Sequence, residues 1–349
     1  MEFSGAERGL FLIALVLIII IAVKTISFIV TLFLMSLILT LLALPAMSWL
    51  KKKGLSDFHA VLVITCAAIL IVLAFIFLTL LSFNTLVADL PQYQDELNTR
   101  LKDISGTLNA VGISAGTEGS PTINLGDVMT LGISSLVSIV DAVMFIFFVG
   151  VTTFFMLLEA PRMASRMEKR LGRDSDTMRQ LNQMTGYVID FIVVRTETNF
   201  IHGVLFGGFL GVIGVHGAIL WGVLTFLLGY IPFFGLVIAA APAIFFAWLQ
   251  FGTPGALAVI AAVCILNLIV ENPVYSYLAA RKFEMPALMV ILSVIFWGWL
   301  LGLVGMLFSV PFTLLLLLVF EMTDELRWIN TTLGVNHLFE DPEPGKTGN

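Results

Sequence analysis

Long apolar segments separated by short polar breaks run through most of this chain. In the first half they lie near residues 9–23, 26–49, 58–83 and 134–158, and in the second half near 201–215, 217–231, 234–250, 255–272, 287–302 and 304–320. A helix that crosses the hydrocarbon core of a bilayer needs about 20 predominantly apolar residues. Because backbone groups at that depth must pair with one another, each segment is expected to be helical. The pattern predicts an all-α, polytopic integral membrane protein.

The composition agrees with a membrane location. Of the 349 residues, 59% are hydrophobic and only 12% are charged, whereas a soluble domain carries about 25% charged residues. A water-soluble fold of this composition would expose large apolar patches, which a lipid bilayer would solvate instead. The bilayer is therefore an expected partner, and no nucleic acid is expected. Cys66 and Cys264 lie inside apolar runs, so we interpret both as packing residues and not as a disulfide.

The basic residues are distributed unevenly among the polar breaks. Lysines occupy 51–53, residues 160–183 hold six basic groups against three acidic ones, and Arg281 and Lys282 follow later. Residues 84–133 are instead mainly acidic. If successive segments cross the membrane in alternating directions, all three basic loops lie on the same side of it. The positive-inside rule makes that side cytoplasmic. We expect a multi-pass protein of the prokaryotic cell (inner) membrane with both termini cytoplasmic.

These features divide the chain into six parts. They are N-terminal membrane helices (1–83), an external amphipathic helix and loop (84–133), a membrane helix (134–158), a cytoplasmic or interfacial helical segment (159–200), a membrane region with two hairpins (201–320) and a cytoplasmic C-terminal tail (321–349).

The external part carries one apolar stripe. Leucines, a tyrosine and an isoleucine recur at three- and four-residue steps, which is typical of one helix face: Leu86, Leu90, Tyr93, Leu97, Leu101, Ile104 and Leu108. The stripe predicts a helix that lies on the membrane surface or on its own bundle, or alternatively one that contributes to a subunit contact.

Two regions read as broken helical hairpins, 201–235 and 286–320. The first holds nine glycines between Gly203 and Gly235, and His216-Gly217 divides it into two arms that are short for a bilayer crossing. The second has a Trp-Gly-Trp sequence at 297–299 and a break at Pro311. Short, interrupted segments in corresponding positions indicate the binding region of a transporter. The alternative is that the glycines only allow helices to pack closely.

Ionisable and amide side chains inside apolar segments mark candidate functional positions, because burying them in lipid costs free energy. Asn267 and Glu271 are four residues apart and share a helix face, and Asn272-Pro273 then interrupts that helix. Glu271 is interpreted either as a functional group or as one half of a structural ion pair. Four further polar residues lead into the first hairpin: Asp190, Arg195, Glu197 and His202. The alternative interpretation of these residues is a structural position at the membrane interface. Asp141 is left unassigned.

Motifs of enzymes are absent. The chain has no H-E-x-x-H, no G-x-S-x-G and no P-loop, so no catalytic residue, no cofactor and no enzymatic activity is expected. The four histidines have no metal-ligand spacing, and no metal site is predicted: His59, His202, His216 and His337.

Several sequence runs together resemble the autoinducer-2 exporter family of membrane transporters. They are Leu157–Arg162 (LLEAPR), Arg195-Thr196, Tyr230–Gly235 (YIPFFG), Asn267 with Asn272, and Leu292–Pro311 (LSVIFWGWLLGLVGMLFSVP), together with the external start Leu90–Tyr93 (LPQY). The resemblance covers nearly the whole chain in order and spacing.

The resemblance implies an α-helical exporter with about eight membrane crossings, including two broken or re-entrant helical hairpins, and a small external helical region. It also implies homo-oligomers, pentamers among them, and an elevator-like motion. Some relatives are assigned to sodium/proton exchange, so membership of the family does not fix the substrate.

The favoured hypothesis is a secondary transporter that exports a small polar solute, an autoinducer-2-like signal or related metabolite, through a site between the hairpins. The predicted substrate-binding residues are Asn267, Glu271, Asn272, Tyr230, Pro232, Gly235, Trp297, Gly298 and Trp299, and Arg195, Thr196 and Glu271 are candidates for coupling or gating. The first alternative is a sodium (cation)/proton antiporter in which a coupling cation or proton titrates Glu271. The second is a non-transporting membrane scaffold.

Overall fold

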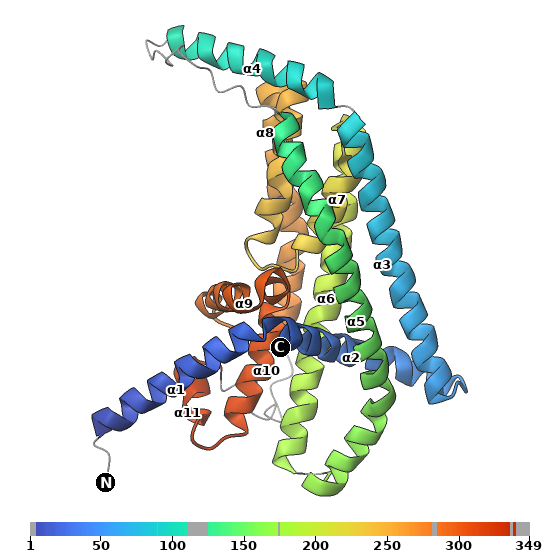
Figure 1. The fold of residues 1–349 in the computed structure, drawn as a ribbon, viewed down its shortest axis with the longest axis vertical. Coiled ribbons are helices and arrows are strands. Elements are labelled where there is room, and N and C mark those ends of the chain that lie inside the picture. Colours follow the sequence, from blue (N-terminus) through green and yellow to red (C-terminus); the bar gives the residue numbers. More distant parts are fainter. Residues whose placement is uncertain are drawn as a thin grey trace, which may run out of the picture.

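The computed structural model describes residues 5–88, 90–110, 125–173, 175–280, 285–335 and 338–339, and these residues form helices and turns without any strand (Figure 1). The helices are α1 (Gly5–Thr25), α2 (Ser27–Lys52), α3 (Asp57–Ala88), α4 (Leu90–Ala110), α5 (Leu125–Leu171), α6 (Asp176–Ile213), α7 (Ala218–Leu228), α8 (Gly235–Ala280), α9 (Ala287–Leu307), α10 (Ser309–Glu321) and α11 (Arg327–Thr332). The all-α prediction is confirmed for the described part of the chain.

Five helical segments are long and apolar enough to cross a membrane: Ser27–Lys52, Asp57–Phe83, Val143–Leu171, Gly235–Pro273 and Ala287–Leu307. Shorter apolar helices at Ile13–Thr25, Ala218–Leu228 and Ser309–Glu321 accompany them. The prediction of a polytopic protein agrees with this set, whereas the count of eight crossings stays a prediction. Arg281, Lys282 and the tail from residue 340 lie outside the described residues.

Two helices continue across boundaries that the sequence analysis placed at residues 158 and 200, because the polar residues there do not interrupt the helix. Helix α6 runs without interruption across residue 200, from an N-cap at Ser175, whose Oγ accepts from the Met178 amide at 3.2 Å, to a left-handed C-cap at Gly214. Several of its interior polar side chains find partners inside the protein, among them Arg195 with Glu271 and Thr196 with Tyr230. Helix α5 likewise continues past residue 158, and Asp141 lies exposed on it.

In the region predicted as the first hairpin, the second half of α6 packs against α7. A Cβ atom added to Gly203 would lie 2.6 Å from the carbonyl oxygen of Gly222, and one added to Gly207 would lie 3.2 Å from the Gly222 Cα. The two backbones thus touch along their glycines, as in small-residue packing of membrane helices. Close packing is therefore one role of Gly203 and Gly207.

Two further reversals, at Gly252 inside α8 and at Gly302 inside α9, share one backbone conformation. Gly252 has φ 68° and ψ −159°, and Gly302 has φ 70° and ψ −150°, a region open only to glycine. In both, a second glycine three residues later, Gly255 or Gly305, faces the carbonyl oxygen eight residues before it, on Ala247 or Trp297. The chain folds back on itself at each point, so α8 consists of two packed arms, a hairpin that the sequence did not predict.

A basic side chain from a distant helix caps each of these reversals. Arg100 of α4 donates from Nε to the carbonyl of Leu249 at 3.3 Å, three residues before Gly252. Lys24 of α1 donates from Nζ to the carbonyls of Trp299 and Leu300, just before Gly302. The last carbonyls of a helix have no partner within it and carry partial negative charge, so a cation there is stabilising.

Helix α4 lies across the end of the molecule opposite to the α5–α6 loop (Figure 1). Tyr93 and Leu97 are 0% and 2% exposed and pack with Leu249 and neighbouring residues of α8. The stripe therefore docks on its own chain, as the first of the two alternatives proposed. The side chains of Leu90, Ile104 and Leu108 lie outside the described ones.

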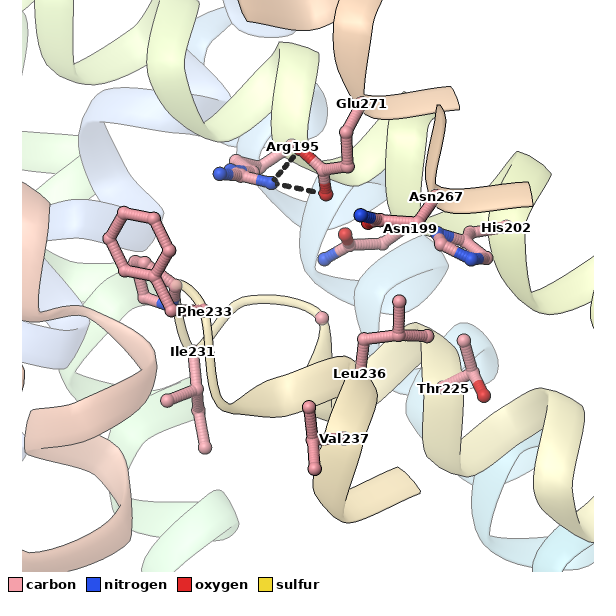
Figure 2. Close-up of a pocket in the computed structure, with 12 residues that line it drawn as sticks. Arg195, Asn199, His202, Thr225, Ile231, Phe233, Leu236, Val237, Asn267 and Glu271 are labelled. Carbon is pink, nitrogen blue, oxygen red and sulfur yellow. Dashed lines mark hydrogen bonds and ion pairs between the residues drawn. The ribbon is translucent and has the colours of Figure 1, made fainter. Parts of the chain in front are cut away.

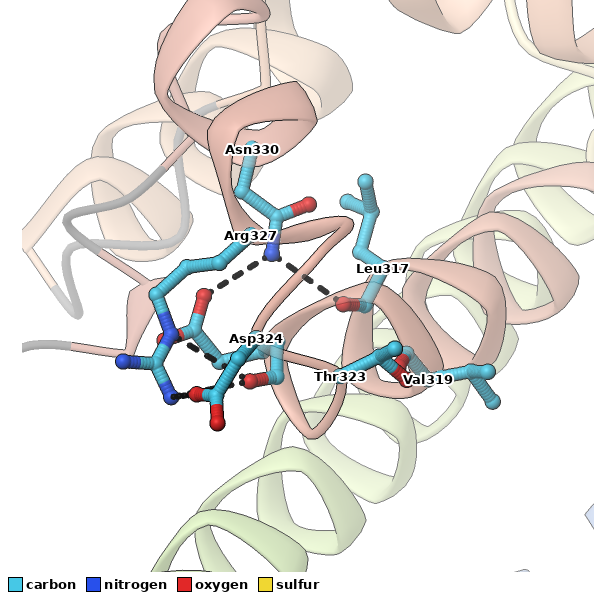
Figure 3. A network of polar contacts seen from close by, with 7 residues as sticks. Leu317, Val319, Thr323, Asp324, Arg327 and Asn330 are labelled. Carbon is cyan, nitrogen blue, oxygen red and sulfur yellow. Dashed lines mark hydrogen bonds and ion pairs between the residues drawn. The ribbon is translucent and has the colours of Figure 1, made fainter. Parts of the chain in front are cut away.

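The largest core cluster joins α2, α6, α9 and α10, and the segment after α11 completes it: Val335 and Leu338 are 0% exposed there. Figure 3 shows the polar network that turns the chain from α10 into α11. Asn330 donates to Glu321 at 3.0 Å and to the Leu317 carbonyl at 3.2 Å, and Arg327 pairs with Glu321 at 3.0 Å. Part of the predicted C-terminal tail is thus folded onto the helical bundle.

We predict that Gly302→Ala lowers the free energy of unfolding by about 1–3 kcal/mol, because the backbone at this position is strained for any residue with a Cβ. The measurement is thermal or denaturant unfolding of the protein in detergent. Gly150→Ala is the control, since a Cβ there meets nothing within 4 Å and its backbone is helical; it should be neutral or slightly stabilising. Equal losses in the two variants would contradict the assigned turn.

We predict that Leu97→Asp detaches α4 from α8 without changing the oligomeric mass, because the contact lies within one chain and cannot accept an unpaired carboxylate. Limited proteolysis should cut 90–110 faster, while light scattering stays unchanged. Asn98→Asp, on an exposed position of the same helix, is the control. A fall in mass with α4 still protected would instead favour a subunit contact.

Candidate functional site

A cavity of about 470 Å³ lies between α6, α7, the turn that follows α7 and both arms of α8. Its lining residues are Arg195, Asn199, His202, Thr225, Gly229, Ile231, Pro232, Phe233, Leu236, Val237, Asn267 and Glu271. In Figure 2 the polar side chains of α6 and the second arm of α8 gather on one side, and Ile231, Leu236 and Val237 lie opposite. The cavity is thus polar on one wall and apolar on the other.

An ion pair joins two elements of the polar wall. Nη1 of Arg195 donates to Oε1 and Oε2 of Glu271 at 2.9 and 3.0 Å, and the two side chains are 7% and 20% exposed. Arg195 comes from α6 and Glu271 from the second arm of α8, so the pair fixes the separation of these helices. Charges this far from water attract strongly but are costly to bury singly, so each requires the other.

The polar wall continues along α6 beyond Arg195. Asn199 and His202 follow at four and seven residues and are 2% and 4% exposed. Arg195 Nε, Asn199 Nδ2 and His202 Nε2 have no hydrogen-bond partner among the described residues. On the opposite helix α7, the Thr225 hydroxyl donates to the carbonyl of Trp221 at 2.8 Å. Three residues that line the cavity from α6 therefore each carry an enclosed nitrogen atom without a hydrogen-bond partner among the described residues.

The apolar wall contains a strained turn. Phe233 has φ 64°, and the amide of Phe234 donates to the carbonyl of Pro232 at 2.8 Å, which is a γ-turn of the rare positive-φ kind. A bulky residue adopts this region only where surrounding structure enforces it. Such strain clusters at ligand sites and moving elements, which marks this turn as a candidate functional element of the cavity wall.

Some of the predicted site residues meet at this cavity. Asn267 and Glu271 line it from the second arm of α8 and Pro232 from the turn after α7, and Arg195 of α6, predicted for coupling or gating, lies beside Glu271. Asn267 is an exposed residue of the lining. The four-residue spacing of Asn267 and Glu271 brings both to one helix face, as the sequence indicated.

Other predicted residues lie around the cavity without lining it. The hydroxyl of Tyr230 is 2.7 Å from Oγ1 of Thr196, and the Tyr230 ring stacks on Phe308 at 6.3 Å. Gly235 is buried at the start of α8, and Asn272 is exposed one residue beyond Glu271. Tyr230 and Thr196 thus tie the turn after α7 to α6.

The three residues predicted from the second hairpin belong to a different part of the protein. Trp297 is in the largest core cluster, where its Nε1 donates to Oγ1 of Thr313 at 2.9 Å. Gly298 faces Met306 across the reversal at Gly302, and Trp299 is 55% exposed beside Lys24. None of the three lines the cavity in the described part of the chain.

Sequence reasoning missed Asn199 and Thr225 and treated His202 as interfacial. The signal for the first and last was present, since Arg195, Asn199 and His202 stand at i, i+4 and i+7 and so share one helix face. The signal for Thr225 was absent, because nothing local places α7 against that face. Among the described residues, no three His, Cys, Asp or Glu side chains gather in a way that could hold a metal ion.

We predict that Glu271→Gln lowers the free energy of unfolding by about 3–5 kcal/mol, because it leaves the buried guanidinium of Arg195 without its counter-charge. Replacing both residues, Arg195→Met with Glu271→Met, should recover much of that loss. Glu197→Gln is the control, since Glu197 is exposed two residues from Arg195 and should change stability by less than about 0.5 kcal/mol. Thermal unfolding in detergent distinguishes these outcomes, and an additive double variant would argue against the pair.

Comparisons with known proteins give one consistent answer. Residues 10–325 match the AI-2E family transporter description. The chain is 34% identical to the AI-2 transport protein TqsA of Escherichia coli over 243 residues, which is 69% of this chain and 71% of that protein. It is 32% identical over 331 residues, 90% and 92% of the two chains, to a Haemophilus influenzae protein named for transport. With its apolar helices and its polar cavity, this chain belongs to the AI-2E transporter family.

Proposed function

We propose that this protein is a secondary transporter that exports a small polar solute through the cavity between α6, α7 and α8. The observation that carries the proposal is the set of paired and unpaired polar side chains around a cavity of about 470 Å³ in a chain built of apolar helices. Polar groups at membrane depth are costly and are found where they contact substrates, ions or one another.

An autoinducer-2-like signal or a related metabolite is the proposed solute. The relative TqsA is named an AI-2 transport protein, and a cavity of about 470 Å³ is of the size that small-molecule sites have. The polar wall would contact the solute through Asn267 and Glu271, and the turn at Pro232 would complete the site. Other predicted residues do not line the cavity in this structure. We propose that they contact the solute when the transporter adopts other conformations: Asn272, Tyr230, Gly235, Trp297, Gly298 and Trp299.

A sodium (cation)/proton antiporter is the second candidate, and the Arg195–Glu271 pair favours it specifically. Protonation of Glu271 would release the guanidinium of Arg195 and loosen the link between α6 and the second arm of α8. A titrating carboxylate at that position would couple proton uptake to helix movement. A membrane scaffold without transport is the further alternative.

We further propose an elevator-like motion, about eight crossings with two re-entrant hairpins, and a homo-oligomer. The hairpin α6–α7 supports the proposed motion because its two arms pack through glycines as one unit. We also propose that the basic end of the molecule, with Lys51 and the α5–α6 loop, faces the cytoplasm of a prokaryotic cell and that α4 faces outward. The opposite positions of α4 and the α5–α6 loop support this orientation (Figure 1).

We predict that liposomes containing the purified protein release trapped autoinducer-2 faster than protein-free liposomes, and that Asn267→Ala lowers this release several-fold. Asn267 is exposed in the cavity, so its loss should cost contacts with the solute and leave the melting temperature unchanged. Asn182→Ala, on an exposed position of α6 away from the cavity, should transport normally.

Three outcomes separate the candidates. Release that depends on the protein and on Asn267 supports the exporter. Sodium-dependent dissipation of a pH gradient, abolished by Glu271→Gln in protein that is still folded, supports the antiporter and contradicts export of this solute. Absence of both activities in folded protein supports the scaffold.

A further inference from the structure

The last turns of α5 present apolar and cationic side chains on one face of the helix. A hollow of about 410 Å³ runs along these turns, and its lining residues are Glu159, Met163, Arg166, Met167, Arg170 and Leu171. The positions recur at three- and four-residue steps, so they share one side of the helix. The face is open to its surroundings, since Met163 is 59% exposed and the side chain of Arg166 is 73% exposed.

Positive charge exceeds negative charge at this end of α5. Residues 159–173 hold five basic groups and two acidic ones. Glu159 forms ion pairs with both Arg162, at 3.4 Å, and Arg166, at 3.0 Å, so two guanidinium groups share one carboxylate. Arg170 forms no ion pair within the described part of the chain. The partner that complements the hollow is therefore an anion.

The neighbours of α5 show where this face lies relative to the membrane. Leu157 is 1% exposed and packs with Met47 of α2 and Val61 of α3, next to the loop that joins those two helices. Close to that loop, Trp49 is exposed and the ammonium of Lys53 lies 3.7 Å from the centroid of its ring. Tryptophan and lysine at a helix end are typical of the lipid headgroup level. The hollow begins one turn after Leu157, so it lies at that level.

The course of α5 keeps the hollow near the membrane surface. Pro161 lies inside the helix, where proline removes a backbone hydrogen bond and bends the axis. Figure 1 shows the last turns of α5 bending toward α6. Side chains of a helix lean toward its N-terminus, which for these turns is the direction of the membrane. Arg166 and Arg170 therefore lean toward the lipid headgroups.

The apolar side chains of the hollow distinguish between two kinds of anion. Met163, Met167 and Leu171 offer no hydrogen bond to a free phosphate ion, which would lose water against them without compensation. A phospholipid instead presents a phosphate and apolar methylene groups side by side. An oblique helix with one apolar stripe and basic flanks is the arrangement by which proteins bind at the surface of an anionic membrane.

We propose that this face of α5 binds the headgroup of an anionic phospholipid. Arg166 and Arg170 contact the phosphate, and Met163 and Met167 pack against the glycerol and the first methylene groups of the acyl chains. The site lies apart from the cavity between α6, α7 and α8, and it requires no transport activity. Lipid binding there would hold the turn between α5 and α6 at the membrane surface.

The test is lipid binding to the full chain, measured by native mass spectrometry from a neutral detergent. The probes are dioleoylphosphatidylglycerol, which is anionic, and dioleoylphosphatidylcholine, which has the same acyl chains and no net charge. The wild-type protein should bind the anionic lipid more tightly. Inorganic phosphate, added at constant ionic strength, should not displace it, because phosphate lacks the apolar part.

Arg166→Gln combined with Arg170→Gln should weaken binding of the anionic lipid about 25-fold, or about fivefold for each basic residue near the headgroups. Lys169→Gln combined with Arg173→Gln is the matched control, because it removes the same charge from the same end of α5 at exposed positions that do not line the hollow. The control should weaken binding less than about threefold. Without lipid, both double variants should melt like the wild type, since all four side chains are at the surface.

Four results would overturn the proposal. Equal binding of the two lipids to the wild type would exclude recognition of the charge. Equal losses in the two double variants would show a diffuse attraction without a site. Displacement of the lipid by inorganic phosphate would show a site for a free anion. A changed oligomeric mass in the Arg166→Gln, Arg170→Gln variant, with lipid binding intact, would make this face a contact between copies of the chain.

Discussion

The architecture depends on reversing apolar helices within a single residue, at Gly252 and Gly302, in surroundings where an unpaired backbone group is costly. Both glycines adopt nearly the same positive-φ conformation, and both are followed three residues later by a glycine that lets the returning arm approach the carbonyl oxygen of the first. A connecting loop would add polar backbone that lipid cannot solvate. The single-residue reversal avoids that cost, but it exposes the final carbonyls of the first arm.

Those carbonyls account for the positions of two basic side chains, Arg100 and Lys24. Arg100 lies outside the apolar helices and Lys24 at the end of the first one, yet each donates to carbonyls directly before a reversal. Arg100 also fixes α4, since the same helix presents Tyr93 and Leu97 to the first arm of α8. Helix α4 is in this way part of the arrangement that stabilises the α8 hairpin. Because that hairpin forms one side of the cavity, α4 indirectly supports the site.

The cavity presents the opposite situation, in which polar groups are left incompletely satisfied. The Arg195–Glu271 pair is well formed, but Asn199 Nδ2 and His202 Nε2, farther along α6, have no hydrogen-bond partner among the residues that the structure describes. A protein selected only for stability would replace Asn199 and His202 by apolar residues, as burial of unpaired polar groups is unfavourable. The positive φ of Phe233 on the facing wall adds strain at the same place. Unpaired donors and backbone strain in one cavity are the features expected of a site built for a ligand.

The sequence alone determined the helical, membrane-spanning class of the protein, because twenty-residue apolar runs leave no other way to satisfy the backbone in lipid. The resemblance of several sequence runs along the chain indicated the family. The candidate pair Asn267 and Glu271 and the amphipathic face of α4 each follow from spacing within one helix. The sequence indicated glycine-rich breaks near 203–217 and 297–305, but not the reversal at Gly252, because Gly-Thr-Pro-Gly is equally compatible with a kink or a loop.

Only the tertiary structure decided which helices face one another. It paired Glu271 with Arg195, 76 residues away, turned Trp297 into the core and Trp299 outward, and brought Thr225 against the polar face of α6. These outcomes depend on long-range packing between apolar helix faces. Almost every face of these helices is apolar, so hydrophobic periodicity does not distinguish a lipid-facing side from a buried one, and the choice rests with glycine contacts, caps and ion pairs between distant segments.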